Sequence, residues 1–111
     1  MKLMIAGSRG IKEFDFTPYV SGEVEMIITG GATGIDAAAE RYADEKRISK
    51  LILRPDYARF GKAAPLKRNE EMVDMADCVL VIWDGESRGS LYTANYAKRK
   101  GKPLTVITVS K

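Results

Sequence analysis

The sequence predicts a doubly wound α/β fold, a Rossmann-like three-layer sandwich with a mainly parallel sheet of about five strands. Five short runs are rich in Ile, Val and Leu, and such near-continuous apolar strands are typical of a parallel sheet buried on both faces. Segments with helical periodicity lie between most of these runs, and a turn signal or a helical pattern follows each one. The 111 residues fit a single domain, which we place at 1–111.

The five apolar runs define the expected strands, which in chain order are Lys2–Ala6, Val24–Thr29, Lys50–Leu53, Cys78–Trp83 and Leu104–Val109. Right-handed crossovers between parallel strands place helices on both faces of such a sheet. The single cysteine, Cys78, is expected to be a small buried core residue. The segment Ile11–Val20 has no clear pattern and is either a short helix or an ordered loop.

Three helices are expected between the strands. The first carries a core-facing stripe formed by Ile35, Ala38, Ala39, Tyr42 and Ala43. The second begins at Pro65, and its inner face carries Leu66, Asn69, Val73 and Ala76. The third runs from about Ser90 to Lys100, and the glycine and proline that follow it are typical helix-ending residues.

Composition narrows the classes of function. The chain has no histidine and one cysteine, so we expect no zinc, copper or iron site. We also expect no cofactor. No apolar run approaches the roughly 20 residues of a membrane span, and residues 1–10 lack the apolar core of a signal peptide. We therefore expect a cytoplasmic protein without a membrane partner. The net charge is +3, and basic residues gather after residue 40. They form either solvated helix faces or a surface that attracts a polyanion or a phosphate-bearing ligand.

Glycine-rich turns follow three of the expected strands. They are GSRG at Gly7–Gly10, GGATGID at Gly30–Asp36 and DGESRGS at Asp84–Ser90. Because ligands of doubly wound folds bind beyond the carboxyl ends of the strands, these turns are expected to surround one site. The helix N-termini that follow favour anions, and Arg9 and Arg88 can add bidentate donors to phosphate or carboxylate oxygens.

Each of these features also has a purely structural interpretation. Thr33 followed by Asp36 resembles a capping box, which alone explains both residues. The glycines of GGATG can serve only as turn residues, and Arg88 can simply be exposed. The turn is not a Walker A loop, because no Gly-Lys-Ser/Thr follows, and it lacks the G-x-G-x-x-G dinucleotide fingerprint.

Several polar and aromatic residues near the expected site leave alternatives open. Asn69 lies on the apolar side of its helix, so it needs a partner, either a neighbouring loop or a ligand. Arg68 beside it is expected to be exposed and available. Trp83 is expected in the core or in a pocket wall, with base stacking as the alternative. Tyr92 and Tyr96 are four residues apart and are expected to form a packing pair or a dimer patch.

Four motifs, in order along the chain, resemble one superfamily. They are IAGSRG, TGGATGIDAAAERYA, LKRNEEMVDMAD and SRGSLYTANYAKRKGKPL, and together they span nearly the whole sequence. In these motifs the chain is similar to the SLOG superfamily, which joins the DNA-processing proteins Smf/DprA with the LOG phosphoribohydrolases. With the intervening DYARFGKAAPLKRN, it looks most like the small stand-alone YspA/YpsA-related branch.

The resemblance implies a Rossmannoid domain that binds a nucleotide or nucleotide derivative, or single-stranded DNA in the DNA-processing branch. It implies that residues 30–34 hold phosphate, and that Arg68 and Asn69 correspond to the Arg-Asn segment of the DNA-processing proteins. Because relatives commonly pair, it also implies a homodimer. The turns and the resemblance together give these expected ligand-binding residues: Gly7, Ser8, Arg9, Gly30, Gly31, Ala32, Thr33, Gly34, Asp36, Arg68, Asn69, Asp84, Ser87, Arg88, Gly89 and Ser90.

Three functions follow from these expectations. The preferred one is binding or sensing of a nucleotide or nucleotide-derived phosphate ligand at the C-terminal end of the sheet. The second is a LOG-like nucleotide N-glycosidase. Ala37 stands where the LOG enzymes have glutamate, so the candidate catalytic carboxylates are Asp36 and Glu40, with Asp84 and Glu86 as alternatives. The third is salt-sensitive binding of single-stranded DNA through the C-terminal basic cluster and Lys62, Lys67 and Arg68.

Overall fold

The computed structural model describes residues 1–110 and contains one sheet of five parallel strands. The strands are β1 (Lys2–Gly7), β2 (Met26–Thr29), β3 (Ser49–Ile52), β4 (Cys78–Trp83) and β5 (Leu104–Thr108). Their order across the sheet is β3-β2-β1-β4-β5. The chain therefore moves from β1 toward one edge and returns to build the other, so the switch point lies between β1 and β4.

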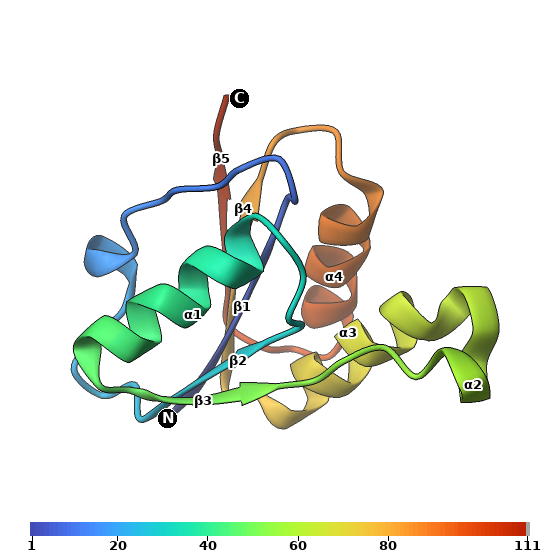
Figure 1. Ribbon diagram of the computed structural model, residues 1–111, viewed down its shortest axis with the longest axis horizontal. Coiled ribbons are helices and arrows are strands. Elements are labelled where there is room, and N and C mark those ends of the chain that lie inside the picture. Colours follow the sequence, from blue (N-terminus) through green and yellow to red (C-terminus); the bar gives the residue numbers. More distant parts are fainter. Residues whose placement is uncertain (111) are drawn as a thin grey trace.

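Helices cover both faces of the sheet (Figure 1). Helix α1 (Ile35–Lys46) packs on one face, and α3 (Ala64–Met75) and α4 (Arg88–Arg99) lie together on the other. The shorter α2 (Tyr57–Phe60) and η2 (Gly61–Ala63) precede α3. The predicted doubly wound three-layer sandwich is confirmed. Within residues 1–110, no helix combines the length and the apolar character needed to cross a membrane.

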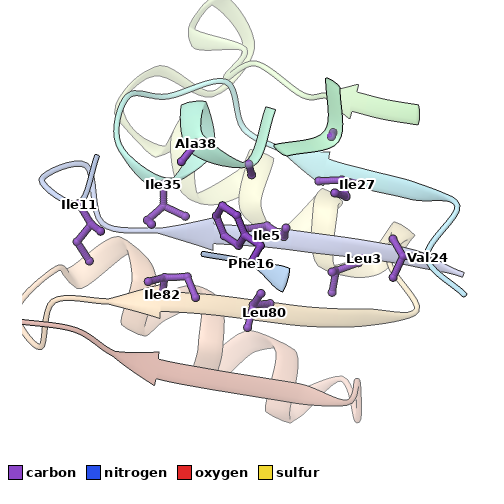
Figure 2. Close-up of a cluster of buried hydrophobic side chains, with 12 residues drawn as sticks. Leu3, Ile5, Ile11, Phe16, Val24, Ile27, Ile35, Ala38, Leu80 and Ile82 are labelled. Carbon is purple, nitrogen blue, oxygen red and sulfur yellow. The ribbon is translucent and has the colours of Figure 1, made fainter. Parts of the chain in front are cut away.

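The core consists of two hydrophobic clusters, one on each face of the sheet. On the α1 face, residues of β1, β2 and β4 pack against Ile35 and Ala38 and against Phe16 from the β1–β2 connection (Figure 2). On the other face, the alternate residues of the same strands pack against α3 and α4, including Met72 and Ala97. Burial on both faces explains why the strands are apolar at almost every position.

The segment Ile11–Val20 is an ordered loop that contains only one 3-10 turn, η1 (Thr17–Tyr19). Its Phe16 is 1% exposed and contacts the rings of Phe14 and Tyr42 edge-on. This loop covers the sheet beside α1, where a further crossover helix would otherwise lie.

Three local expectations need correction. Cys78 is half-buried rather than buried, because it begins β4 at the sheet end where the chain's first residues lie, with its Sγ 3.9 Å from Met1 Sδ. Leu66 is exposed and faces a cleft instead of the core. Helix α4 begins at Arg88 and not at Ser90, because the Ser87 side chain caps it by accepting a hydrogen bond from the Ser90 N–H.

Gly7 ends β1 where this strand meets both β4 and α1. A Cβ atom built on it would lie 2.5 Å from the Ile82 carbonyl oxygen and 2.7 Å from the Ile35 side chain. We expect Gly7→Ala to lower the free energy of unfolding by about 1–3 kcal/mol, because backbone must move to admit the methyl group. Urea denaturation measures this change. Gly22→Ala, where nothing lies within 4 Å, is the control and should be neutral or slightly stabilising; equal losses in both variants would contradict the packing argument.

Candidate functional site

A cleft of about 420 Å³ lies at the C-terminal ends of β1 and β4. The turn after β1, the turn after β2, the first half of α3 and the start of α4 all line it. Its lining residues are Ala6, Gly7, Arg9, Gly10, Ala32, Asp36, Pro65, Leu66, Arg68, Asn69, Met72, Asp84, Ser87, Gly89, Ser90 and Thr93. Ten of the sixteen expected ligand-binding residues are therefore brought together here.

Ser8 supports the cleft from behind instead of lining it. The side chain is buried, and its Oγ accepts a hydrogen bond from the Asp84 N–H at 3.0 Å. The Ser8 carbonyl oxygen accepts a bond from the Ile35 N–H at 3.3 Å, at the start of α1. Ser8 thus joins the three turns to one another. Arg9, next along the chain, is exposed, lines the cleft and makes no ion pair within residues 1–110.

The GGATGID turn owes its glycines to close packing. A Cβ on Gly34, whose φ is 75°, would lie 2.4 Å from the Arg9 carbonyl oxygen. Gly34 is also the N-cap of α1, and no side chain caps this helix. The capping-box interpretation of Thr33 and Asp36 is therefore wrong, and Thr33 is exposed. The Asp36 carboxylate instead accepts a hydrogen bond from the Ala32 N–H at 3.2 Å.

Arg68 is buried, with 8% of its surface exposed, which corrects the expectation of an available side chain. Its Nη1 donates to the Gly30 carbonyl oxygen at 2.6 Å and to the Leu53 carbonyl oxygen at 3.2 Å. Gly30 makes this approach feasible, because a Cβ there would lie 2.5 Å from Arg68 Nη1. Burial lowers the pKa of the guanidinium, while the nearby Asp36 carboxylate opposes that change. Arg68 still remains charged in any ordinary buffer.

Asn69 finds its partner in α4. Its Oδ1 accepts from Arg68 Nε at 2.8 Å, and its Nδ2 donates to Thr93 Oγ1 at 2.9 Å. The Thr93 hydroxyl in turn donates to the Gly89 carbonyl oxygen at 3.0 Å. A continuous chain of hydrogen bonds therefore runs from the turn after β2 to the first turn of α4. The sequence did not indicate Thr93, because a threonine inside a helix has no distinguishing local signal.

Asp36 is the buried carboxylate of the cleft, with only 7% of its surface exposed. Burial raises its pKa, and the hydrogen bond from Ala32 and the charge of Arg68 offset only part of that rise. The other candidate carboxylate, Glu40, lies outside the cleft lining, with its Oε1 3.7 Å from Lys50 Nζ. Of Asp36 and Glu40, only Asp36 lines the cleft.

The DGESRGS turn forms the opposite wall. Asp84 Oδ1 accepts hydrogen bonds from the N–H groups of Glu86 and Ser87, both at 2.8 Å. Gly89 and Ser90 bring the first turn of α4 to the cleft, whereas the exposed Arg88 is not among its lining residues. Trp83 does not line the cleft either. Its Nε1 donates to the Ser87 carbonyl oxygen at 2.9 Å and braces the turn.

A second hollow of about 290 Å³ adjoins the cleft on the β2–β3 side. It accounts for three more expected residues, Gly30, Gly31 and Thr33, and it adds Arg54, Pro55 and Tyr57, which the sequence did not indicate. These three residues follow β3 without any glycine-rich turn to mark them. Arg54 Nη1 donates to the Gly31 carbonyl oxygen at 3.2 Å.

The remaining expectations concern aromatic residues and metals. Tyr92 and Tyr96 attach α4 to α3, with their hydroxyls donating to the carboxylates of Glu70 and Asp74 respectively. In the part of the chain that the structure describes, no three His, Cys, Asp or Glu side chains are grouped as metal ligands would be. The sequence matches no family model, and no curated protein or solved structure is significantly similar to it.

Asp36→Asn should make the protein more stable at neutral pH. The pKa of the Asp36 carboxyl is higher in the folded protein than in the unfolded chain, where it is about 3.9. The stability of the protein therefore falls as the pH rises from that unfolded value through the folded pKa. Asparagine is uncharged, so the variant does not undergo this loss of stability. We expect a higher melting temperature for the variant at pH 7 and no such advantage below about pH 3.9.

Thermal unfolding followed by circular dichroism across this pH range measures the effect. Glu45→Gln removes an exposed carboxylate from the same helix and serves as the control for a simple change of net charge. An Asp36→Asn variant that is less stable than the parent at pH 7 would contradict the direction of the pKa shift.

Proposed function

We propose that the cleft binds a nucleotide or a nucleotide-derived phosphate ligand. The observation that carries this proposal is the convergence of Arg9, the start of α4 and the buried Asp36 in one hollow at the switch point of the sheet. Doubly wound folds bind their ligands in this crevice. The SLOG-like motifs supply most of the residues that line it and support the same class of ligand.

The α4 side of the cleft suits a phosphate. The first backbone N–H groups of a helix have no carbonyl partner within the helix and lie at the positive end of its dipole, so they bind anions. At Gly89 nothing lies within 4 Å of the place a Cβ would occupy, so a ligand can approach the backbone closely. Arg9 is exposed on the facing turn and adds a bidentate cation.

The Asp36 side of the cleft suits a sugar. Carboxylates in Rossmann-like folds accept hydrogen bonds from ribose hydroxyls. Asp36 is buried, and burial raises the pKa of its carboxyl. Keeping this ionisable group inside the fold therefore lowers the stability of the protein when the carboxyl is charged. Such groups concentrate at functional sites. Asp84, Ser87 and Ser90 add further polar side chains on the opposite wall.

Substitution of Gly89 tests the proposal directly. Gly89→Asp places a negative charge beside the proposed phosphate, and the new side chain has room. An acidic residue in the first turn of a helix also stabilises it by about 0.3–1 kcal/mol, so the variant should fold. We expect binding of AMP, measured by titration calorimetry, to weaken at least about tenfold through like-charge repulsion.

Gly22→Asp adds the same charge before β2, near the N-terminal end of the sheet, where nothing lies within 4 Å, and it should bind AMP as the parent does. Ligand-induced rises in melting temperature provide a second readout for a panel of nucleoside monophosphates and ribose 5-phosphate. A panel that causes no shift would sink the proposal. A shift with oligo-dT alone, lost at moderate salt, would assign the basic surface to single-stranded DNA instead.

Hydrolysis of an N-glycosidic bond is the second candidate function, and the placement of Asp36 favours it. Glycosidic cleavage needs a carboxylate next to an oxocarbenium-like centre, and Asp36 is the buried carboxylate of the cleft. Burial raises the pKa of Asp36, and a raised pKa is the direction that favours a carboxyl acting as a general acid.

Release of free base from nucleoside 5′-monophosphates, followed by chromatography, measures this activity. Asp36→Asn should abolish release while AMP still binds, and Glu40→Gln should release base at the parent rate because Glu40 lies outside the cleft. An absence of release from the whole panel would rule out this second function and leave the binding proposal standing.

A further inference from the structure

The second hollow differs from the cleft in its charge. Three arginines line it, Arg9, Arg54 and Arg68, and its lining includes no acidic residue. The cleft is lined by two arginines and two aspartates, so its charges are balanced. Arg9, Ala32 and Arg68 line both spaces and form the boundary between them. A ligand that extends out of the cleft past Arg9 therefore enters a strongly positive hollow.

Arg54 is held in position but keeps most of its donors. The side chain is exposed, and Nη1 donates to the Gly31 carbonyl oxygen at 3.2 Å. Within residues 1–110, no carboxylate forms an ion pair with Arg54, Arg9 or Arg68. A guanidinium carries five N–H donors in a rigid fork, so a clamp on one carbonyl leaves others to bind phosphate oxygens.

Tyr57 gives the hollow an aromatic wall. It is the first residue of α2 and is 59% exposed. Asp56 caps this short helix by accepting a hydrogen bond from the Arg59 N–H at 3.1 Å, which fixes the turn that carries the ring. An exposed tyrosine beside arginines is a combination that binds nucleic-acid components, because bases stack on aromatic rings while cations hold the adjacent phosphate.

We infer that the second hollow is a subsite for a second nucleotide unit, so that the full ligand is a dinucleotide whose two units are joined through phosphate. One unit occupies the cleft, the linking phosphate lies at the Arg9 boundary, and Arg54 and Tyr57 hold the phosphate and base of the other. This inference rests on the proposed function of the cleft. It covers both a 5′,5′-pyrophosphate link and a phosphodiester link, because both are negatively charged and Arg9 lines the cleft as well as the second hollow.

The test compares one-unit and two-unit probes on matched variants. AMP, NAD and the dinucleotide pApA are titrated by calorimetry into the parent, Tyr57→Ala, Tyr57→Phe and Arg54→Met. We expect the parent to bind NAD or pApA at least tenfold more tightly than AMP. Tyr57→Ala should weaken the affinity for the two-unit probe about tenfold, since base–aromatic stacking is lost. Tyr57→Phe should retain the parent affinity.

Arg54→Met keeps much of the side-chain stem but removes the charge. It should weaken the affinity for the two-unit probe without changing the affinity for AMP. Tighter binding of NAD or of pApA identifies the link.

If AMP binds and neither two-unit probe binds more tightly, the inference is overturned and the proposed function stands. The same holds if the Tyr57 and Arg54 variants weaken the affinity for AMP as much as that for the two-unit probe. If none of the three probes binds the folded parent, the proposed function itself fails. Affinity that keeps rising from pApA to longer oligonucleotides would also overturn the small-ligand assignment.

Discussion

The Arg68 guanidinium donates to the carbonyl oxygens of Gly30 and Leu53, and in this way joins α3 to the turns that end β2 and β3. A buried charge is costly unless hydrogen bonds and an opposite charge surround it. Asn69 supplies a hydrogen-bond acceptor, and the charge of the nearby Asp36 carboxylate offsets part of the fall in the pKa of Arg68 that burial causes. Arg68 lines both hollows, and its close approach is the reason that position 30 needs a glycine.

The same network extends to the opposite wall of the cleft. The Asn69 side chain donates a hydrogen bond to the Thr93 hydroxyl, which in turn donates to the Gly89 carbonyl oxygen at the start of α4. Ser8 ties the turn after β1 to Asp84 and to the start of α1. Buried and half-buried side chains that are hydrogen-bonded within the protein thus frame the cleft. Such preorganisation lowers the entropy lost on binding.

Much of the fold was predictable because strands buried on both faces leave continuous apolar runs, as in β1 and β4. The place of the cleft agrees with the topology, since turns after parallel strands share one end of the sheet. Arg68 was misjudged because its main partner, Gly30, lies 38 residues away and no local pattern reports the contact. The sequence did not indicate Arg54 and Tyr57, because they lie in the connection between β3 and α3, where neither a helical stripe nor a glycine-rich turn distinguishes them.

The central place of β1 also determines when the cleft can form. Its neighbours are β2 and β4, and the contact between Ser8 and Asp84 that joins the two walls spans 76 residues of chain. No short segment contains the cleft, so its assembly coincides with completion of the sheet, and non-local pairings of this kind fold slowly. A bound ligand should therefore protect the central strands as a whole from hydrogen exchange, and not only the loops that it touches.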